Sequence, residues 1–209
     1  MSRRGTIWRT QTTAVMCVYF MHYHGYEPKT ILNVGVSSGF EIGVWRWLYP
    51  HVPIVGIDPR RKLRGQHKDI RYVQVAASNH DGIESYCMAC HSIRCKQTDE
   101  HAPYLQQVPA VLLDDIARDL EPPYFIWMDV DGGELLALQG GQKTLEQTKW
   151  LNVEIIDWEP GDGQATEDWL VSRGFKRFWK DRNTHDRLYC RNGDLPAQTL
   201  SEVASGTSA

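Results

Sequence analysis

The chain has 209 residues, of which 42% are hydrophobic and 23% are charged, and its formal net charge is −3. This composition excludes a disordered acidic chain, a collagen-like chain and a coiled coil, and the length suits about one domain. The slightly negative charge argues against a protein that binds nucleic acid mainly by electrostatics. Five cysteines, an odd number, and the lack of a signal-peptide pattern predict a cytoplasmic protein. The apolar run 14–20 is far shorter than the ~20 residues of a membrane span, so no span is expected.

Short apolar runs, predicted as strands, alternate along the chain with amphipathic segments predicted as helices. The first half is predicted to contain a helix at 14–23, a strand at 31–36, a helix at 40–48, and strands at 54–57, 72–76 and 83–87. The second half is predicted to contain a strand end and a helix within 111–120, a strand at 124–128, a helix at 134–145, a strand at 150–156 and a helix at 165–172. We expect flexible tails at 1–13 and 198–209 around a single domain at 14–197.

Continuous apolar strands that alternate with helices predict a parallel sheet covered on both faces, which is an α/β sandwich. The last two predicted strands, at 175–179 and 187–190, are joined by a short polar segment. Strands this close in sequence are expected to form an antiparallel hairpin. A parallel α/β sheet that ends in a hairpin is the layout of Rossmann-like methyltransferases.

The first predicted strand ends in a glycine-containing turn, Gly35 to Gly39, directly before a helix. Glycines at such a turn let a ligand approach the backbone, and the helix N-terminus offers free N–H groups. Asp58 ends the next strand, 23 positions after Gly35, where an acidic residue can hold two ribose hydroxyls. A tight turn and an N-capping aspartate are the structural alternative. The combination favours a nucleoside ligand, whereas a phosphate-binding loop would need Lys-Ser or Lys-Thr after Gly39.

A series of further motifs follows this turn across residues 30–190. The motifs are Asn33-Val34-Gly35-Val36-Ser37-Ser38-Gly39, Gly56-Ile57-Asp58-Pro59, Val75-Ala76-Ala77-Ser78-Asn79-His80-Asp81-Gly82, Leu112-Leu113-Asp114-Asp115-Ile116, Met128-Asp129-Val130-Asp131-Gly132-Gly133-Glu134, Leu138-Gln139-Gly140-Gly141 and Leu151-Asn152-Val153-Glu154-Ile155. In this order and spacing, the sequence resembles the FkbM-type S-adenosylmethionine-dependent methyltransferases. The resemblance implies a Rossmann-like class I fold, with a mostly parallel seven-stranded sheet that ends in an antiparallel hairpin, and S-adenosylmethionine as cofactor.

The resemblance also implies which residues contact the cofactor, namely Asn33, Gly35, Ser37, Gly39, Asp58, Ala76, Ala77 and Asp129. Among them, Asp58 would hold the ribose, the two alanines would border the adenine, and Asp129 would lie beside the transferred methyl group. Asn33 stands where aspartate is usual, which removes a negative charge near the ammonium and sulfonium of the cofactor. Trp127 replaces a customary lysine, and Asp131 replaces a customary glutamate.

Acidic residues are expected to cluster around two predicted strand ends; they are Asp129, Asp131, Glu134, Glu154 and Asp157. A hydroxyl or amine acceptor loses a proton on methylation, so a nearby carboxylate or histidine acting as base adds rate. Asp129 is the first candidate base, with Glu154 and His185 next. Two alternatives stay open, because hard oxygen ligands suit Mg²⁺ or Ca²⁺ and because Glu134 could simply stabilise the first turn of a helix.

A group of cysteines and histidines and a run of basic residues could each be functional or purely structural. Possible zinc ligands are Cys87, Cys90, Cys95, His91 and His101. Their spacing matches no common zinc module, so we expect no metal. The basic run from Arg60 to Arg64 is expected to be a solvated helix face, with recognition of a phosphorylated acceptor as the alternative.

The sequence therefore predicts an S-adenosylmethionine-dependent methyltransferase that methylates a hydroxyl of a small molecule or sugar. The alternatives are methylation of nitrogen, a nucleic-acid or peptide acceptor, and a cofactor-binding protein without catalysis. The acceptor itself is not encoded in any motif of the sequence.

Overall fold

Seven strands form the central sheet, in the order β3-β2-β1-β7-β8-β10-β9. They are β1 (Thr30–Val34), β2 (Ile54–Ile57), β3 (Arg71–Val73), β7 (Tyr124–Met128), β8 (Thr148–Glu154), β9 (Phe175–Lys180) and β10 (Asp186–Arg191). The first five pair in parallel, whereas β10 is antiparallel to both β8 and β9. The predicted parallel sheet with a terminal hairpin is confirmed. The computed structural model describes residues 3–37, 39–60, 70–94, 102–156, 160–181 and 184–191, with backbone only for residues 3–12.

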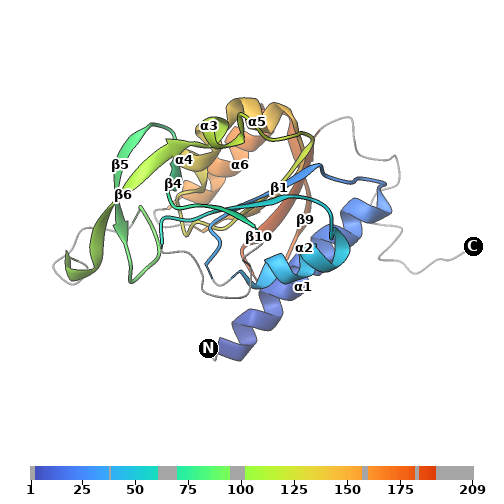
Figure 1. Cartoon of the computed structure of the whole chain (residues 1–209), viewed down its shortest axis with the longest axis horizontal. Helices are drawn as coiled ribbons and strands as arrows, with labels where there is room; N and C mark the ends of the chain where they lie inside the picture. The colour runs from blue at the N-terminus through green and yellow to red at the C-terminus, as the bar shows by residue number, and fades with distance from the viewer. Residues whose placement is uncertain are drawn as a thin grey trace, which may run out of the picture.

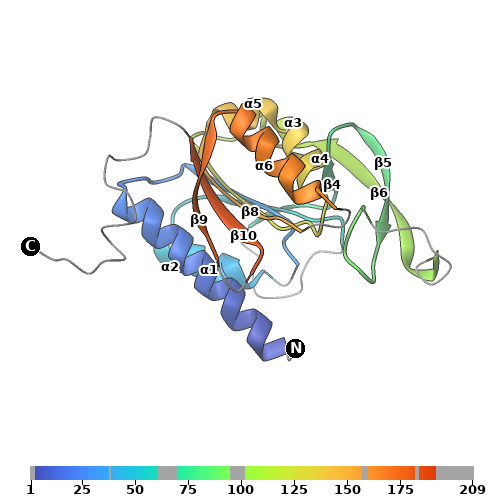
Figure 2. The ribbon, with the colours of Figure 1, turned by 180° about the vertical axis from the view of Figure 1, so that it is seen from behind.

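Helices cover both faces of this sheet, as Figures 1 and 2 show. On one face lie α1 (Arg3–Tyr23) and α2 (Phe40–Leu48), and on the other lie α3 (Leu113–Ala117), α4 (Glu134–Gln139), α5 (Gln142–Glu146) and α6 (Asp162–Ser172). Neighbouring strand residues serve opposite faces: Ile31 packs with the first helix pair, whereas Leu32 packs with the second group. The central strands are buried on both sides, which explains their continuous apolar sequences.

The helix α1 begins at Arg3, eleven residues earlier than the predicted start at Ala14. Residues 3–13 were expected to be a flexible tail, but their backbone continues the helix. Buried contacts of Ala14, Cys17 and Met21 hold the following turns, and each residue added to an existing helix costs little. None of the described helices is both long and apolar enough to cross a membrane. The tail predicted at 198–209 lies outside the described residues.

Two buried hydrogen bonds join α1 to distant parts of the chain. The hydroxyl of Thr13 donates to Oδ2 of Asp181 at 2.9 Å. The thiol of Cys17 donates to Oδ1 of Asn152 at 3.5 Å, and Asn152 in turn donates to Oδ1 of Asp186 at 2.7 Å. The first helix is therefore fixed against β8 and the hairpin of β9 and β10.

A second sheet, which the sequence did not predict, projects from one end of the molecule (Figure 1). It has the order β4-β6-β5 and consists of β4 (Ala76–Ser78), β5 (Gly82–Cys87) and β6 (Leu105–Leu112), with the 3₁₀ helix η1 (Ala102–Tyr104) before β6. The strand predicted at 72–76 is divided between the two sheets. Val75 donates its N–H to the carbonyl of Val73 at 3.1 Å, and this tight turn ends β3 before β4 begins.

The helix predicted at 134–145 is likewise divided, into α4 and α5, at Gly140 and Gly141. A Cβ atom on Gly140 would lie 1.9 Å from the carbonyl oxygen of Ser78. The glycine therefore permits the end of α4 to pack directly on β4. This contact joins the second sheet to the main one.

Candidate active site

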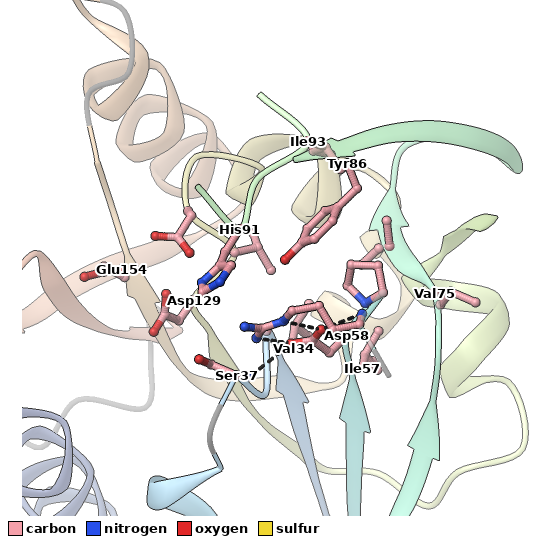
Figure 3. A pocket seen from close by; sticks show the side chains of 17 residues that line it. Val34, Ser37, Ile57, Asp58, Val75, Tyr86, His91, Ile93, Asp129 and Glu154 are labelled. Carbon is pink, nitrogen blue, oxygen red and sulfur yellow. Dashed lines mark hydrogen bonds and ion pairs between the residues drawn. The ribbon is translucent and has the colours of Figure 1, made fainter. Parts of the chain in front are cut away.

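A cavity of about 240 Å³ lies where the parallel strands β1, β2, β7 and β8 end. The second sheet borders its other side (Figure 3). The polar and small residues that line it are Gly35, Ser37, Asp58, Arg60, Ala76, Ala77, Tyr86, His91, Asp129, Asp131 and Glu154. Ligands of open α/β sheets bind at this carboxyl edge, because the strand-to-helix turns expose backbone and side chains there.

The turn after β1 needs glycine at position 35. Gly35 has a φ of +88°, and a Cβ atom there would lie 1.7 Å from the carbonyl oxygen of Asp129. The N–H of Asp129 donates to the carbonyl of Val34 at 2.9 Å. The backbones that follow β1 and β7 are thus in direct contact, which fixes Asp129 beside the glycine turn.

Asp58, at the end of β2, is already surrounded by hydrogen-bond donors. Its Oδ2 accepts from the backbone N–H of Ser37 at 2.9 Å and from Nη2 of Arg60 at 2.6 Å. Its Oδ1 accepts from the backbone N–H and from Nε of Arg60, at 2.8 and 3.0 Å. Figure 3 shows this network inside the cavity. The guanidinium of Arg60 therefore contacts both carboxylate oxygens of Asp58.

Asp129 and Glu154 form a pair of half-buried carboxyl groups at the ends of β7 and β8. Burial, the charge of Glu154 and a hydrogen bond between the two side chains raise the pKa of Asp129 well above its usual range. Burial also raises the pKa of Glu154 to about 7, against the lowering effect of the same hydrogen bond. Near neutral pH the pair therefore retains at least one proton, held on Asp129 and shared with Glu154.

Asp131 joins this pair as a third carboxyl group. One oxygen from each of Asp129, Asp131 and Glu154 lies within 4.8 Å of the others, and no other group of described residues meets this criterion for a metal site. Three oxygens at this spacing are within reach of a single cation such as Mg²⁺. Acidic clusters of this kind also occur without an ion, so we assign no metal to them.

Backbone strain concentrates at this cavity. In the described part of the chain, the non-glycine residues with positive φ are Ser37, His91 and Asp131, at +45°, +57° and +51°. All three line the cavity. Such conformations cost of order 1–3 kcal/mol each and persist only where the surrounding structure enforces them, which is most common at functional sites.

Several predicted site residues lie outside the cavity lining. Asn33 is buried and donates through Nδ2 to Oε1 of Glu41 at 2.6 Å. Glu41 therefore restores a carboxyl group beside the position where aspartate is usual, and burial raises its pKa to about 7. Gly39 precedes α2 in a left-handed conformation. His185 is exposed, and its carbonyl accepts from the N–H of Ile155 at 3.0 Å.

Glu134 has a structural role in the first turn of α4. Its Oε1 accepts from the N–H groups of Val130 and Gly132, at 3.3 and 2.9 Å. The side chain thus closes the turn that carries Asp131, and burial raises its pKa to about 7. These bonds reach the loop before the helix, which differs from the expected stabilisation of the first turn through the helix dipole. Asp157, Cys95 and His101 lie outside the described residues.

Sequence reasoning missed three polar residues of the cavity, which are Arg60, Tyr86 and His91. Arg60 was assigned to a solvated helix face, and His91 was considered only as a zinc ligand. His91 enters the cavity through packing between distant segments, which local patterns do not report, whereas Arg60 turns back onto Asp58 two residues before it. The sequence did contain one indication that Arg60 belongs to the site, which is its position two residues after Asp58, an expected ligand-binding acid.

Comparison with known structures supports the fold that these features define. A candidate caffeoyl-CoA O-methyltransferase from Staphylococcus aureus superposes with a TM-score of 0.54 at 9% identity, over 92% of this chain and 93% of that one. MycE methyltransferase from the mycinamycin biosynthetic pathway, in complex with Mg and SAH, gives 0.45 at 13% identity, over 97% of this chain and 55% of that one. The plantazolicin methyltransferase BpumL, in complex with SAH, gives 0.33 at 12% identity, over 95% and 62%. The fold is that of the Rossmann-like methyltransferases.

Residues 34–177 match the methyltransferase FkbM domain, and the chain belongs to this family. None of the curated proteins matches the sequence. Family membership identifies the protein as an S-adenosylmethionine-dependent methyltransferase. The chemistry of the cavity fits this cofactor, because it offers an acid at the end of β2, small apolar residues at Ala76 and Ala77, and carboxyl groups that can attract a positive charge.

Proposed function

We propose that the protein transfers a methyl group from S-adenosylmethionine to a hydroxyl of a small molecule or sugar. The observation that supports this most directly is the arrangement of acids around the Gly35 turn. Asp58 lies on one side of this turn, and the pair of Asp129 and Glu154 lies on the other. This arrangement suits a nucleoside at one end of the cavity and a cation at the other.

At the nucleoside end, Asp58 accepts hydrogen bonds from the two ribose hydroxyls, and Ala76 and Ala77 border the adenine. Arg60 must first turn away from Asp58, because its guanidinium occupies both carboxylate oxygens. The backbone N–H of Ser37 can keep its bond to Oδ2 throughout. The turn from Gly35 to Gly39 borders the methionine part, with Asn33 and its partner Glu41 behind it.

At the other end, the carboxyl pair carries at most one negative charge near neutral pH, since it retains at least one proton. When bound, S-adenosylmethionine supplies a methyl group already activated by its positive sulfur. Glu154 and Asp129 stabilise that charge and hold it in place, and alignment of donor and acceptor provides much of the rate. Because Asp129 retains its proton, we assign it an electrostatic role rather than that of base. His185 has no role in this proposal.

The acceptor side of the proposal rests on the charge of the cavity. Its acidic end disfavours a phosphate-bearing acceptor such as nucleic acid. An amine acceptor is the second candidate, because three carboxyl groups at the methyl end would attract an ammonium group. A cytoplasmic location, expected from the sequence, remains part of the proposal.

Methyl-labelled S-adenosylmethionine, incubated with the protein and the small-molecule fraction of a cell extract, tests this function. Mass spectrometry and NMR of the labelled product identify the acceptor and the atom that is methylated. We expect label on oxygen. Label on nitrogen would select the amine candidate, and label on polypeptide or nucleic acid would contradict a small-molecule acceptor. Cofactor binding without any labelled product would identify a binding protein without catalysis.

The variant Asp58→Asn tests the nucleoside end, with Asp119→Asn on the exposed surface as the matched control. Loss of charge-assisted hydrogen bonds costs about 1.5–3 kcal/mol each. We therefore expect Asp58→Asn to bind S-adenosylhomocysteine at least about tenfold more weakly in calorimetry. Equal affinity in the two variants would remove Asp58 from the ribose site.

A further inference from the structure

His91 is the last residue of the turn that follows β5, and hydrogen bonds on both sides hold this turn. The N–H of Cys87 donates to the carbonyl of Ser92 at 2.9 Å, and the N–H of Met88 donates to the carbonyl of Tyr104 at 2.8 Å. The buried hydroxyl of Ser92 accepts from the N–H of Arg94 at 2.9 Å. These bonds enforce the left-handed backbone of His91, with its φ of +57°, which an unconstrained histidine rarely adopts.

The same turn is joined to the far side of the cavity. Nη2 of Arg94 lies 3.4 Å from Oδ2 of Asp162 at the start of α6. Ile93 packs so closely on Gly133 that a Cβ atom on that glycine would lie 3.2 Å from it. Gly133 belongs to the turn that carries Asp131. The second sheet thus places His91 over the carboxyl edge of the main sheet and keeps it there.

The imidazole of His91 projects into the cavity beside the carboxyl groups (Figure 3). It lies near enough to Asp131 for its charge to favour the ionised form of that carboxyl group. Among the residues that the structure describes, no hydrogen-bond partner occupies the ring, and the residue is exposed. A ring nitrogen is therefore available to a ligand in the cavity.

Two other acids of the cavity, Asp58 and Asp129, are poorly suited to accept a proton. Both oxygens of Asp58 accept hydrogen bonds from Arg60, and Asp129 retains the proton that it shares with Glu154. Histidine is the commonest general base near neutral pH.

We propose that His91 is the base that receives the acceptor's proton; the inference rests on the proposed function. The proton moves from the acceptor O–H to a ring nitrogen of His91 while the acceptor oxygen bonds to the methyl carbon. The carbon–sulfur bond breaks, and its electron pair remains on sulfur. The imidazolium then releases the proton to water.

The test compares His91→Asn and His91→Gly with His80→Gln, which changes an exposed histidine of the same small sheet. Asparagine and glycine both tolerate a positive φ, so the turn should keep its conformation. In the extract fraction that wild-type protein labels, we expect His91→Asn to lower kcat at least about 100-fold, with unchanged affinity for S-adenosylhomocysteine. The fall of kcat at acid pH should disappear, and added imidazole should restore turnover to His91→Gly.

Other ionisable groups that face the imidazole can also contribute to the pH dependence of kcat. These groups are Asp58 and Arg60 after β2, Tyr86 on β5, Asp129 and Asp131 after β7, and Glu154 on β8. Rescue by imidazole separates His91 from them, because none of the others is replaced by that molecule. Turnover within threefold of wild type, or a reduced rate that imidazole does not restore, would overturn the assignment.

A second readout does not depend on turnover. NMR of histidine-labelled protein, with the His91 signal assigned from His91→Asn, should show that signal shifting when S-adenosylhomocysteine binds, while the His80 and His185 signals stay in place. If wild-type protein labels nothing, hydroxyl methylation fails as the function. In that case, an unshifted His91 signal would also contradict the inference that His91 lies beside the bound cofactor. A shifted signal would support that location.

Discussion

The two ends of the cavity hold their acids in opposite electrostatic states. At the end of β2, Asp58 is compensated by the guanidinium of Arg60 and by backbone N–H groups. At the ends of β7 and β8, Asp129 and Glu154 have mainly each other and further carboxyl groups as neighbours. Arg60 is the one Lys or Arg among the described residues that line the cavity.

One cavity can in this way recognise both the sugar and the positive charge of a nucleoside cation. Asp58, whose charge is balanced by Arg60, stabilises the folded protein before ligand binds. It can accept hydrogen bonds from ligand hydroxyls only after Arg60 moves away. Uncompensated acids reduce stability until a cation arrives. Neutralising an acid should therefore lower the stability of the fold at the Asp58 end of the cavity and raise it at the Glu154 end.

Neutralising an acid at each end should change stability with opposite sign. Burial raises the pKa of Glu154 to about 7 from an ordinary 4.5, so the folded protein binds a proton that the unfolded chain has released. Stability of the cofactor-free protein should fall as pH rises between these values and then level off. Glu154→Gln should reduce this slope and raise the free energy of unfolding at about pH 8 by about 1–3 kcal/mol in urea titrations.

Asp58→Asn should instead lower the free energy of unfolding by about 1–3 kcal/mol, because Arg60 loses its counter-charge. Its effect should persist across the same pH range. A Glu154→Gln variant that is less stable than wild type at about pH 8 would show that the acidic end is compensated by a group outside this pair.

The two ends should also discriminate differently between S-adenosylmethionine and S-adenosylhomocysteine. Only the first carries a positive sulfur, so Glu154→Gln should weaken its binding about tenfold and leave the second nearly unchanged. Asp129→Asn should have a smaller effect, because the amide can still donate to Glu154 as the protonated acid does. Calorimetry with both ligands measures the ratio of their affinities. If Asp58→Asn changed this ratio and Glu154→Gln did not, the positive sulfur would lie beside Asp58, which contradicts the proposal.

The smallest expected effect concerns Arg60. Its guanidinium competes with the ribose for both oxygens of Asp58, so Arg60→Ala should bind both ligands roughly threefold to tenfold more tightly. Arg94→Ala, which removes an ion pair outside this network, is the matched control. Weaker binding by Arg60→Ala would mean that the guanidinium contacts the ligand directly.

Much of the fold could be predicted because its central strands are apolar on both faces. The runs around β1, β2, β7 and β8 correspond to predicted strands, and the predicted hairpin of β9 and β10 is present. The second sheet could not be predicted in the same way. The strand predicted at 83–87 corresponds to β5, but β5 and β6 are half-exposed and β6 contains Pro109. The buried strand β4 follows β3 after only two residues, so no turn signal separates these two strands.

The site was predictable where it depends on neighbours in sequence. Gly35 needs its left-handed conformation because of the turn in which it lies, and Asp58 follows directly from the end of β2. The partners of these residues were not predictable. Arg60 returning to Asp58, Glu41 replacing the missing acid beside Asn33, and His91 reaching over the main sheet all depend on side-chain packing in three dimensions.

The hydrogen bonds of α1 have a consequence for how the chain folds during synthesis. Thr13 and Asp181 are 168 residues apart, and Cys17 and Asn152 are 135 apart. At a translation rate of about 5–20 residues per second, the apolar side of α1 waits many seconds for its partners. Contacts of such long range form late and slowly. The helix is therefore the segment most exposed to chaperones and proteases before the last strand enters the sheet.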